Sequence, residues 1–343
     1  MTRTGRGLAL HGALLGAATL VAFRTWTYDA SKAPKHGETD LWPGTPEQVQ
    51  EVRFEAKTGT LSIEPRQDSF GRYFIGNVKK AAAPEPKKDG DPAQSEPPPQ
   101  PAEAKLARFI ATKEGEQLVD SVAPLRALRV LGKVSGAQKT DFGLDKEEGK
   151  LYVRIAGKEH RLVFGGTTPG GSDYYVTEPA TGNAYVVAGS IFRDLTSADQ
   201  RLLERNLHGF EDSAVKRVKI TLGTSSRELV RSTDNKEFWA KPDSPKQKDE
   251  TATNWMTKVS RVHVTSYEGD KLSPAPAPAD MVVRIDYFDD RKQIGYLEIV
   301  RRLGEKPDKP EYVARSEHTR WYASVIRSSA EQVDQDTKSV LNQ

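Results

Sequence analysis

Apolar and polar positions follow a helical period and then an alternating one between Glu116 and Leu195. The apolar residues of the first part recur every three or four positions after a polar start, at Leu118, Val119, Val122 and Leu125. This spacing predicts a short amphipathic helix. Proline removes a backbone donor and clashes with the preceding turn, so Pro124 predicts the end of the helix and a strand from Leu128 to Val134.

Runs of β-branched and aromatic residues follow this strand. Glycine-containing turns separate them, which is typical of an antiparallel meander. The four runs are residues 151–155, 161–164, 174–176 and 184–187. Before the helix, alternation between Val49 and Ile75 predicts three more short strands.

The second half of the chain repeats this plan. Residues 49–54 resemble residues 215–220 at an offset of 166, and Tyr174-Tyr175-Val176 resembles Glu311-Tyr312-Val313 at an offset of 137. The helical pattern recurs at the same offset of 137 as Trp255, Met256, Val259 and Val262. The offsets differ by 29 residues, close to the length of a proline-rich stretch at 81–105, which we interpret as an insertion. Chance similarity between two domains is the alternative.

The predicted fold class is therefore α+β, with an N-terminal transmembrane helix followed by two repeated modules of antiparallel strands and short helices. The boundary between the modules is expected near a helix from Ala198 to Leu207, which opens with a capping-box pattern at Ser197 and Gln200. The expected organisation is an anchor at 1–28, a tether at 29–46, a first module at 47–208 and a second module at 209–343.

The N-terminal segment from Gly7 to Phe23 carries no charge. As a helix it would span about 25 Å, and Arg24, Trp26 and Tyr28 suit the membrane interface. A cleaved signal peptide is the alternative. Arg3 and Arg6 would remain in the cytoplasm, so the expected location is the bacterial inner membrane, single pass, with a periplasmic body.

Two glycines inside this segment form a small-xxx-small pair. Gly12 and Gly16 would let another membrane helix approach closely, with a helix that contacts only lipid as the alternative.

The order of these patterns resembles a known bacterial family, domain of unknown function 4340. The residues that carry the resemblance are Leu118 to Leu131, the turn Phe142-Gly143-Leu144-Asp145, Leu151 to Gly165, Ser172 to Val176 and Tyr185 to Val187. It covers residues 47–200 well and the second half more loosely. The resemblance implies an envelope protein associated with an ABC transporter, linked to type IV pili or surface motility. It implies no catalytic residues.

Residues that could carry chemistry are few. The six histidines are scattered, so neither a metal site nor a cofactor is predicted, and the glycine-rich stretch 165–171 opens a strand rather than a phosphate-binding helix. Asp286, Asp289 and Asp290 with Glu298 could form paired carboxylates for hydrolysis or calcium binding. A solvated turn between two strands is the favoured interpretation, and no enzyme activity is predicted.

Aromatic residues of the second module suggest a weak candidate surface for polysaccharide. These are Tyr312, Trp321 and Tyr322. Basic and acidic residues nearly cancel, at 51 against 48, so a nucleic-acid partner is not expected.

The leading hypothesis is a non-enzymatic accessory subunit whose partners are an ABC permease and ATPase, together with periplasmic or pilus proteins. A periplasmic binding module for cell-wall or exported polysaccharide is the alternative.

Overall fold

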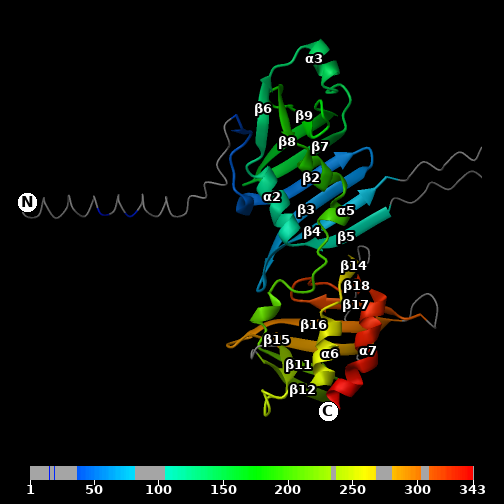
Figure 1. Ribbon diagram of the computed structural model, residues 1–343. Coiled ribbons are helices and arrows are strands. Elements are labelled where there is room, and N and C mark those ends of the chain that lie inside the picture. Colours follow the sequence, from blue (N-terminus) through cyan, green and yellow to red (C-terminus); the bar gives the residue numbers. More distant parts are fainter. Residues whose placement is uncertain are drawn as a thin grey trace, which may run out of the picture.

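The computed structural model describes two antiparallel sheets with a small number of helices (Figure 1). The described residues are Leu15, Thr19, 37–81, 105–232, 237–267, 280–302 and 309–342.

The first sheet has ten strands in the order β1-β6-β10-β9-β8-β7-β2-β3-β4-β5. In chain order they are β1 (Thr39–Asp40), β2 (Val49–Ala56), β3 (Gly59–Asp68), β4 (Gly71–Lys80), β5 (Lys105–Ala111), β6 (Arg126–Gly132), β7 (Gly149–Ile155), β8 (Lys158–Thr167), β9 (Asp173–Glu178) and β10 (Asn183–Ala188). The helices are α2 (Lys113–Val122), α3 (Gly136–Asp141), α4 (Gly189–Thr196) and α5 (Ala198–Arg201).

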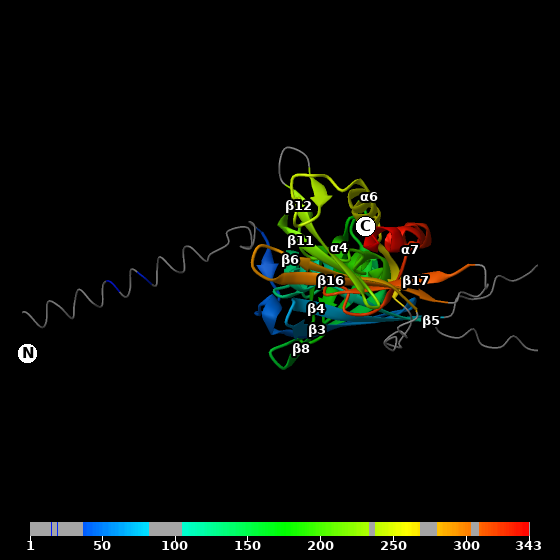
Figure 2. The same cartoon turned by 90° about the horizontal axis from the view of Figure 1, so that it is seen from below.

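The second sheet has eight strands in the order β13-β12-β11-β15-β16-β17-β18-β14. In chain order they are β11 (Arg217–Leu222), β12 (Ser225–Ser232), β13 (Phe238–Ala240), β14 (Val264–Tyr267), β15 (Met281–Phe288), β16 (Gln293–Arg302), β17 (Glu311–Ser316) and β18 (Ala323–Val325). The helices are α6 (Glu250–Val259) and α7 (Arg327–Leu341). Seen from below, α6 and α7 lie on the same side of this sheet (Figure 2).

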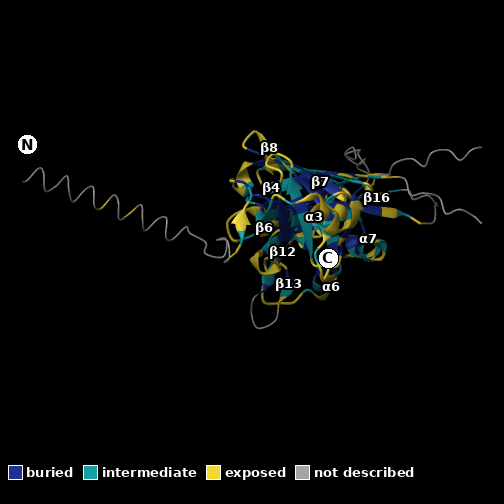
Figure 3. Ribbon diagram, turned by 90° about the horizontal axis from the view of Figure 1, so that it is seen from above, coloured by how far each residue is buried: buried dark blue, intermediate teal, exposed yellow. Residues whose placement is uncertain are grey.

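Helices cover one face of each sheet because their apolar stripes need a partner surface. The buried side of α2 includes Leu118 and Val122, and that of α6 includes Trp255 and Val259. Alternating strand residues such as Phe54 and Ile220 fill the same layer. Buried positions run along the strands, whereas exposed positions gather on loops and outer surfaces (Figure 3).

Eight strands of the first sheet follow the same pairing order as the eight strands of the second. In this correspondence β6, β10, β9, β8, β7, β2, β3 and β4 match β14, β18, β17, β16, β15, β11, β12 and β13. The ladders share their register as well. Phe54 lies opposite Leu151, which lies opposite Leu162, and the same row in the second sheet is Ile220, Ile285 and Leu297. The first sheet adds the edge strands β1 and β5.

Two predictions about the fold are wrong. The described residues form mostly antiparallel β-structure in two sheets with few helices, rather than an α+β fold. The helix expected from Ala198 to Leu207 is only α5, which ends at Arg201, and residues 203–206 form no regular secondary structure. The boundary between residues 208 and 209 stays a prediction.

Within the described part of the chain, no helix is long and apolar enough to cross a membrane. The predicted transmembrane helix at 7–23, and with it the predicted single-pass inner-membrane location with a periplasmic body, is therefore not supported by the described residues. Apart from Leu15 and Thr19, residues 7–23 lie outside the described residues, and so do Gly12 and Gly16.

Candidate functional site

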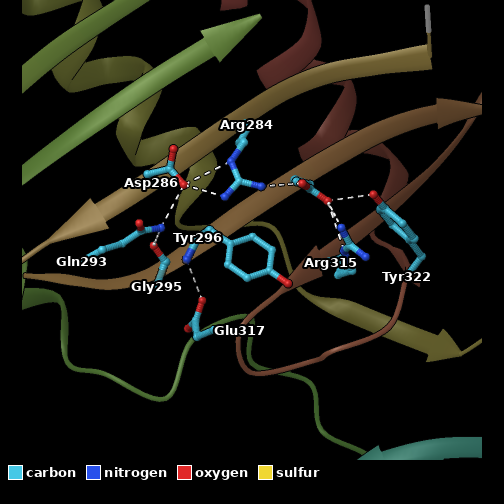
Figure 4. A network of polar contacts seen from close by, with 9 residues as sticks. Arg284, Asp286, Gln293, Gly295, Tyr296, Arg315, Glu317 and Tyr322 are labelled. Carbon is cyan, nitrogen blue, oxygen red and sulfur yellow. Dashed lines mark hydrogen bonds and ion pairs between the residues drawn. The ribbon is translucent and has the colours of Figure 1, made fainter. Parts of the chain in front are cut away.

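A buried carboxylate is the centre of a polar network on the second sheet. Glu298 of β16 is 6% exposed. Its Oε1 accepts a hydrogen bond from Arg284 at 2.6 Å. Its Oε2 accepts hydrogen bonds from Arg315 at 2.8 Å and from the Tyr322 hydroxyl at 2.7 Å. Arg284, Arg315 and Tyr322 therefore converge from three directions on one carboxylate (Figure 4).

The arginines of this network also stack on aromatic rings. The guanidinium carbon of Arg284 lies 4.9 Å from the centre of the Tyr296 ring, and that of Arg315 lies 4.8 Å from the Tyr322 ring. Cation–π contact adds to the ion pairs, so both guanidinium groups are fixed in place.

Asp286 belongs to the same network. One oxygen of its carboxylate accepts hydrogen bonds from Arg284 at 2.8 Å and from the Gln293 amide at 3.0 Å (Figure 4). Burial opposes ionisation of Glu298, but the hydrogen bond from Tyr322 and the charge of Arg315 outweigh it and lower the pKa of that carboxyl below its ordinary value. A carboxyl with a lowered pKa is ionised at neutral pH and cannot serve as a general acid there.

The other two acidic residues of the sequence-predicted cluster lie in the β15–β16 turn. Asp289 accepts hydrogen bonds at 2.7 Å from the backbone N–H groups of Arg291 and Lys292, which lower the pKa of its carboxyl. Asp290 is exposed. The structure therefore places Asp286 and Glu298 in one network and Asp289 and Asp290 in the turn, and no group of three or more potential metal ligands occurs among the described residues.

A second buried carboxylate lies where the two sheets meet. Glu204 belongs to the connecting segment, residues 202–216, between α5 and β11. It is 2% exposed, and its Oε2 lies 3.0 Å from Nε2 of His318 and accepts a hydrogen bond from the Thr112 hydroxyl. Burial opposes ionisation of Glu204, but the hydrogen bonds from His318 and Thr112 outweigh it and lower the pKa of the carboxyl. Thr112 lies between β5 and α2, and His318 lies in the loop between β17 and β18, so Glu204 contacts the ends of strands from both sheets.

An ion pair crosses the same boundary. Arg320 of the β17–β18 loop contacts both carboxylate oxygens of Asp68 on β3, at 3.0 and 3.2 Å. Its guanidinium also lies 4.4 Å from the centre of the Tyr73 ring. Burial opposes ionisation of Asp68, but the hydrogen bond from Arg320 outweighs it, so the pKa of this carboxyl is lowered.

The connecting segment also joins the edges of the two sheets. The backbone N–H of Glu204 donates to the carbonyl of Ile110 on β5, and the N–H of Val264 on β14 donates to the carbonyl of Arg205, at 2.8 and 3.0 Å. The segment therefore lies between the outer edges of β5 and β14. The two sheets are held as one body by backbone hydrogen bonds as well as by the ion pairs.

A cavity of about 330 Å³ lies beside the connecting segment. Its lining includes His208, Trp239, Met256 and Tyr287. Nδ1 of His208 lies 3.0 Å from Oε1 of Glu317, whose other oxygen accepts a hydrogen bond from the N–H of Tyr296 at 2.9 Å (Figure 4).

The contacts at this cavity fix the position of the His208 imidazole, but they do not direct the hydroxyl of either lining threonine toward it. A Cβ at Gly295 would lie 2.5 Å from the Glu317 carboxylate, so glycine is needed there for Glu317 to reach His208. The hydroxyls of Thr253 and Thr257, which also line the cavity, both donate to backbone carbonyls. Neither is oriented as a nucleophile toward the histidine.

The aromatic residues singled out in the sequence do not form an open surface. Tyr312 is buried and donates a hydrogen bond to Asp334 on α7 at 2.9 Å; burial and this carboxylate raise the pKa of Tyr312 to about 12. Tyr322 is buried against Glu298. Trp321 is partly buried, with the Arg108 guanidinium 5.1 Å from its ring centre, so it belongs to the boundary between the sheets.

The residues that join the sheets were not identified from the sequence. Glu204, His318, Asp68 and Arg320 lie up to 252 positions apart, and each belongs to no recognisable motif. Only the pairing of strands brings them together.

The comparisons with known proteins give one match. A family model described as "Domain of unknown function (DUF4340)" matches residues 110–281, half of the chain. The chain belongs to the DUF4340 family. Neither the curated proteins nor the solved structures compared with it include a match.

The matched region differs from the extent of the resemblance expected from the sequence, residues 47–200. It begins in β5 and ends at the first residue of β15, so it contains the second half of the first sheet, the connecting segment and the first half of the second sheet. The DUF4340 match therefore includes Glu204 and its partner Thr112, but not His318.

Proposed function

We propose that this DUF4340 protein is a non-enzymatic accessory subunit that binds partner proteins in an ABC-transporter-type machine. Its proposed partners are the ABC permease and ATPase. A link to type IV pilus biogenesis or surface motility is part of the proposal, and it rests on the resemblance to the family alone.

The observation that carries the proposal is the junction between the sheets. Glu204 and Arg320 fix the second sheet to the first, and the connecting segment bonds to an edge strand on each side. A protein that positions partners relative to one another needs a body whose parts keep a fixed arrangement. Two sheets joined by a buried carboxylate, an ion pair and shared backbone hydrogen bonds satisfy this requirement.

The state of the acidic residues also supports an accessory role. Glu298 and Asp286 share Arg284, and Glu204 faces His318 and Thr112. Carboxylates that are neutralised by fixed internal partners contribute to structure, whereas hydrolases keep a pair of carboxylates with different pKa values facing the substrate. The polysaccharide alternative depended on Tyr312, Trp321 and Tyr322; both tyrosines are buried and Trp321 is partly buried, which favours the accessory role.

Crosslinking in living cells tests the proposal. Tagged full-length protein would be crosslinked, purified and analysed by mass spectrometry. We expect the ABC permease and the ATPase to be recovered, because an accessory subunit remains bound to its machine. Recovery of neither, under conditions that preserve a known membrane complex, would contradict the proposal.

A matched pair of variants sharpens the experiment. Arg320→Ala removes the ion pair that crosses the junction, whereas Arg66→Ala removes an exposed pair with Glu64 on the same β3 strand. We expect lower recovery of the partners with Arg320→Ala and unchanged recovery with Arg66→Ala. Equal recovery of the partners with both variants would contradict a role for the fixed junction in partner binding.

A further inference from the structure

The outer edge of β6 is open over most of its length. The two-residue strand β1 pairs only with Arg126 and Ala127. Among the described residues no other strand pairs with this side of β6, so the edge from Leu128 to Gly132 has no ladder partner. We refer to residues 128–132 as the open edge; it lies at the margin of the first sheet (Figure 1).

The corresponding edge in the second sheet contacts the connecting segment. β14 takes the place of β6 in the shared strand order, and its Val264 N–H donates to the carbonyl of Arg205 in the connecting segment. A backbone hydrogen bond therefore joins another segment of the chain to this edge of the fold. In the first sheet β1 binds in the same place but covers only two residues.

The open edge exposes apolar side chains. Leu128 is 37% exposed and Val130 is 49% exposed, with exposed Arg129 between them. Register shifts in the β6–β10 ladder leave Leu128 and Leu131 without a partner residue on β10, which breaks the normal alternation of the two faces. Apolar side chains beside an unpaired strand edge are typical of strand-addition sites.

The charges along this strand indicate the chemistry of the occupant. Arg126 lies 3.4 Å from Asp40 of β1, so the segment already bound there presents an acidic residue to β6. Arg129 and Lys133 continue the positive charge along and beyond the open edge, and both are exposed. Two copies of β6 would bring these like charges together, which disfavours a homodimer through this edge.

Other segments of the chain suit the edge less well by their sequences. The residues before β1 include Lys32 and Lys35 as well as Asp29 and Glu38, so they offer no net negative charge. The insertion at 81–105 contains seven prolines, which cannot donate ladder hydrogen bonds.

We propose that the open edge of β6 binds an extended, acidic segment of a partner protein by strand addition. This inference rests on the proposed function and names the kind of segment that a partner would offer. The partner backbone pairs with residues 128–132, its apolar residues cover Leu128 and Val130, and its carboxylates face Arg129 and Lys133.

A phage-displayed library of short random peptides, selected on the immobilised full-length protein, tests the inference. We expect selected peptides to combine acidic and apolar residues, and their affinities would be measured by fluorescence anisotropy. The double variant Leu128→Ser/Val130→Ser and the variant Arg129→Glu should each weaken binding about tenfold or more. Arg129→Lys should restore binding because it keeps the charge.

The control is Leu106→Ser on β5, the edge strand at the other end of the first sheet, where Leu106 is 46% exposed. It should leave peptide affinity unchanged. Thermal unfolding of every variant shows whether the fold is retained. Selected peptides that bind the double variant as tightly as the original protein, a lack of enriched peptides, or a homodimer abolished by the double variant would each overturn the inference.

The two proposals fail separately. Recovery of the permease and ATPase that is insensitive to the β6 variants would overturn the strand-addition site and leave the accessory role intact. Peptides that bind the open edge without recovery of permease or ATPase from cells would overturn the accessory role and leave the site intact.

Discussion

The two sheets share an order of eight strands, yet they fill equivalent positions with different chemistry. The row Arg284, Glu298 and Arg315 in the second sheet corresponds to Lys150, Val163 and Thr177 in the first. The second sheet therefore carries a buried ionic cluster where the first carries a valine between two polar residues. Two sheets with the same strand order and register can therefore carry different side chains at equivalent positions.

The ends of the two sheets differ as well. At the edge of β14 the N–H of Val264 donates to the connecting segment, which joins it to the first sheet, whereas the edge of β6 has no ladder partner from Leu128 onward among the described residues. The same position in the fold therefore serves the internal junction in one sheet and remains accessible in the other. The predictions below test these differences.

The largest expected effect concerns the helix layer. Trp255 in α6 is almost fully buried and donates from its indole N–H to the carbonyl of Val333 in α7, whereas the corresponding residue of α2 is Leu118. Trp255→Ala should lower the free energy of unfolding by about 3–5 kcal/mol because it leaves a cavity and removes this hydrogen bond. Urea denaturation measures the change. Trp255→Leu, which introduces the residue type of α2, should cost less; an equal loss for both would contradict the account.

The next effect concerns the ionic cluster. Glu298→Val should cost about 2–3 kcal/mol, because it leaves Arg284 and Arg315 without their shared carboxylate in a partly buried place. The triple variant Arg284→Lys/Glu298→Val/Arg315→Thr introduces the residues of the first sheet. It should recover more than half of the loss, although the Tyr322 hydroxyl stays unpaired. No recovery in urea denaturation would show that the two faces are not interchangeable.

A smaller effect is expected at the junction. Arg320→Ala should lower the free energy of unfolding by about 1–2 kcal/mol, since Asp68 remains partly exposed to water after losing its partner. The matched variant Arg66→Ala breaks an exposed pair and should cost about 0.5 kcal/mol or less. Chemical denaturation followed by fluorescence measures both, and equal costs would contradict a special role for the junction.

The smallest effect is a dependence on pH. Glu204 and Asp68 have pKa values lowered from 4.5 and 3.8, so the unfolded chain binds protons more readily at both groups. Their contribution to stability is therefore complete above about pH 5 and is lost as the pH falls through the lowered values. Thermal unfolding between neutral and acidic pH measures this loss. Glu204→Gln should reduce the dependence of stability on pH. An unchanged dependence would show that Glu204 does not contribute to it.

Strands and helices of the body could be predicted from local patterns. The apolar spacing at Leu118 to Leu125 corresponds to α2, and the runs from 151 to 187 correspond to β7, β8, β9 and β10. The length of the helix after Ser197 could not be predicted, because the extended connecting segment is stabilised by hydrogen bonds to β5 and β14. These partners lie far away in the chain and leave no periodic signal.

The polar sites were less predictable. Acidic residues 286–298 were visible as a group, but only strand pairing shows that Arg284 and Arg315 neutralise Glu298. The burial of Tyr312 and Tyr322 depends on α7 and on the β17–β18 loop, so their spacing alone did not distinguish buried rings from exposed ones. The acidic residue Glu204 gave no sequence signal that it joins two sheets.

The most direct test of the central claim is hydrogen exchange measured by mass spectrometry on the full-length protein, free and in complex with the proposed permease and ATPase. The claim is that the protein binds its partners through the open edge of β6. The account predicts rapid exchange at residues 128–132 in the free protein and marked slowing in the complex, with residues 264–267 slow in both. Unchanged exchange at 128–132 in a complex that contains both partners would contradict it.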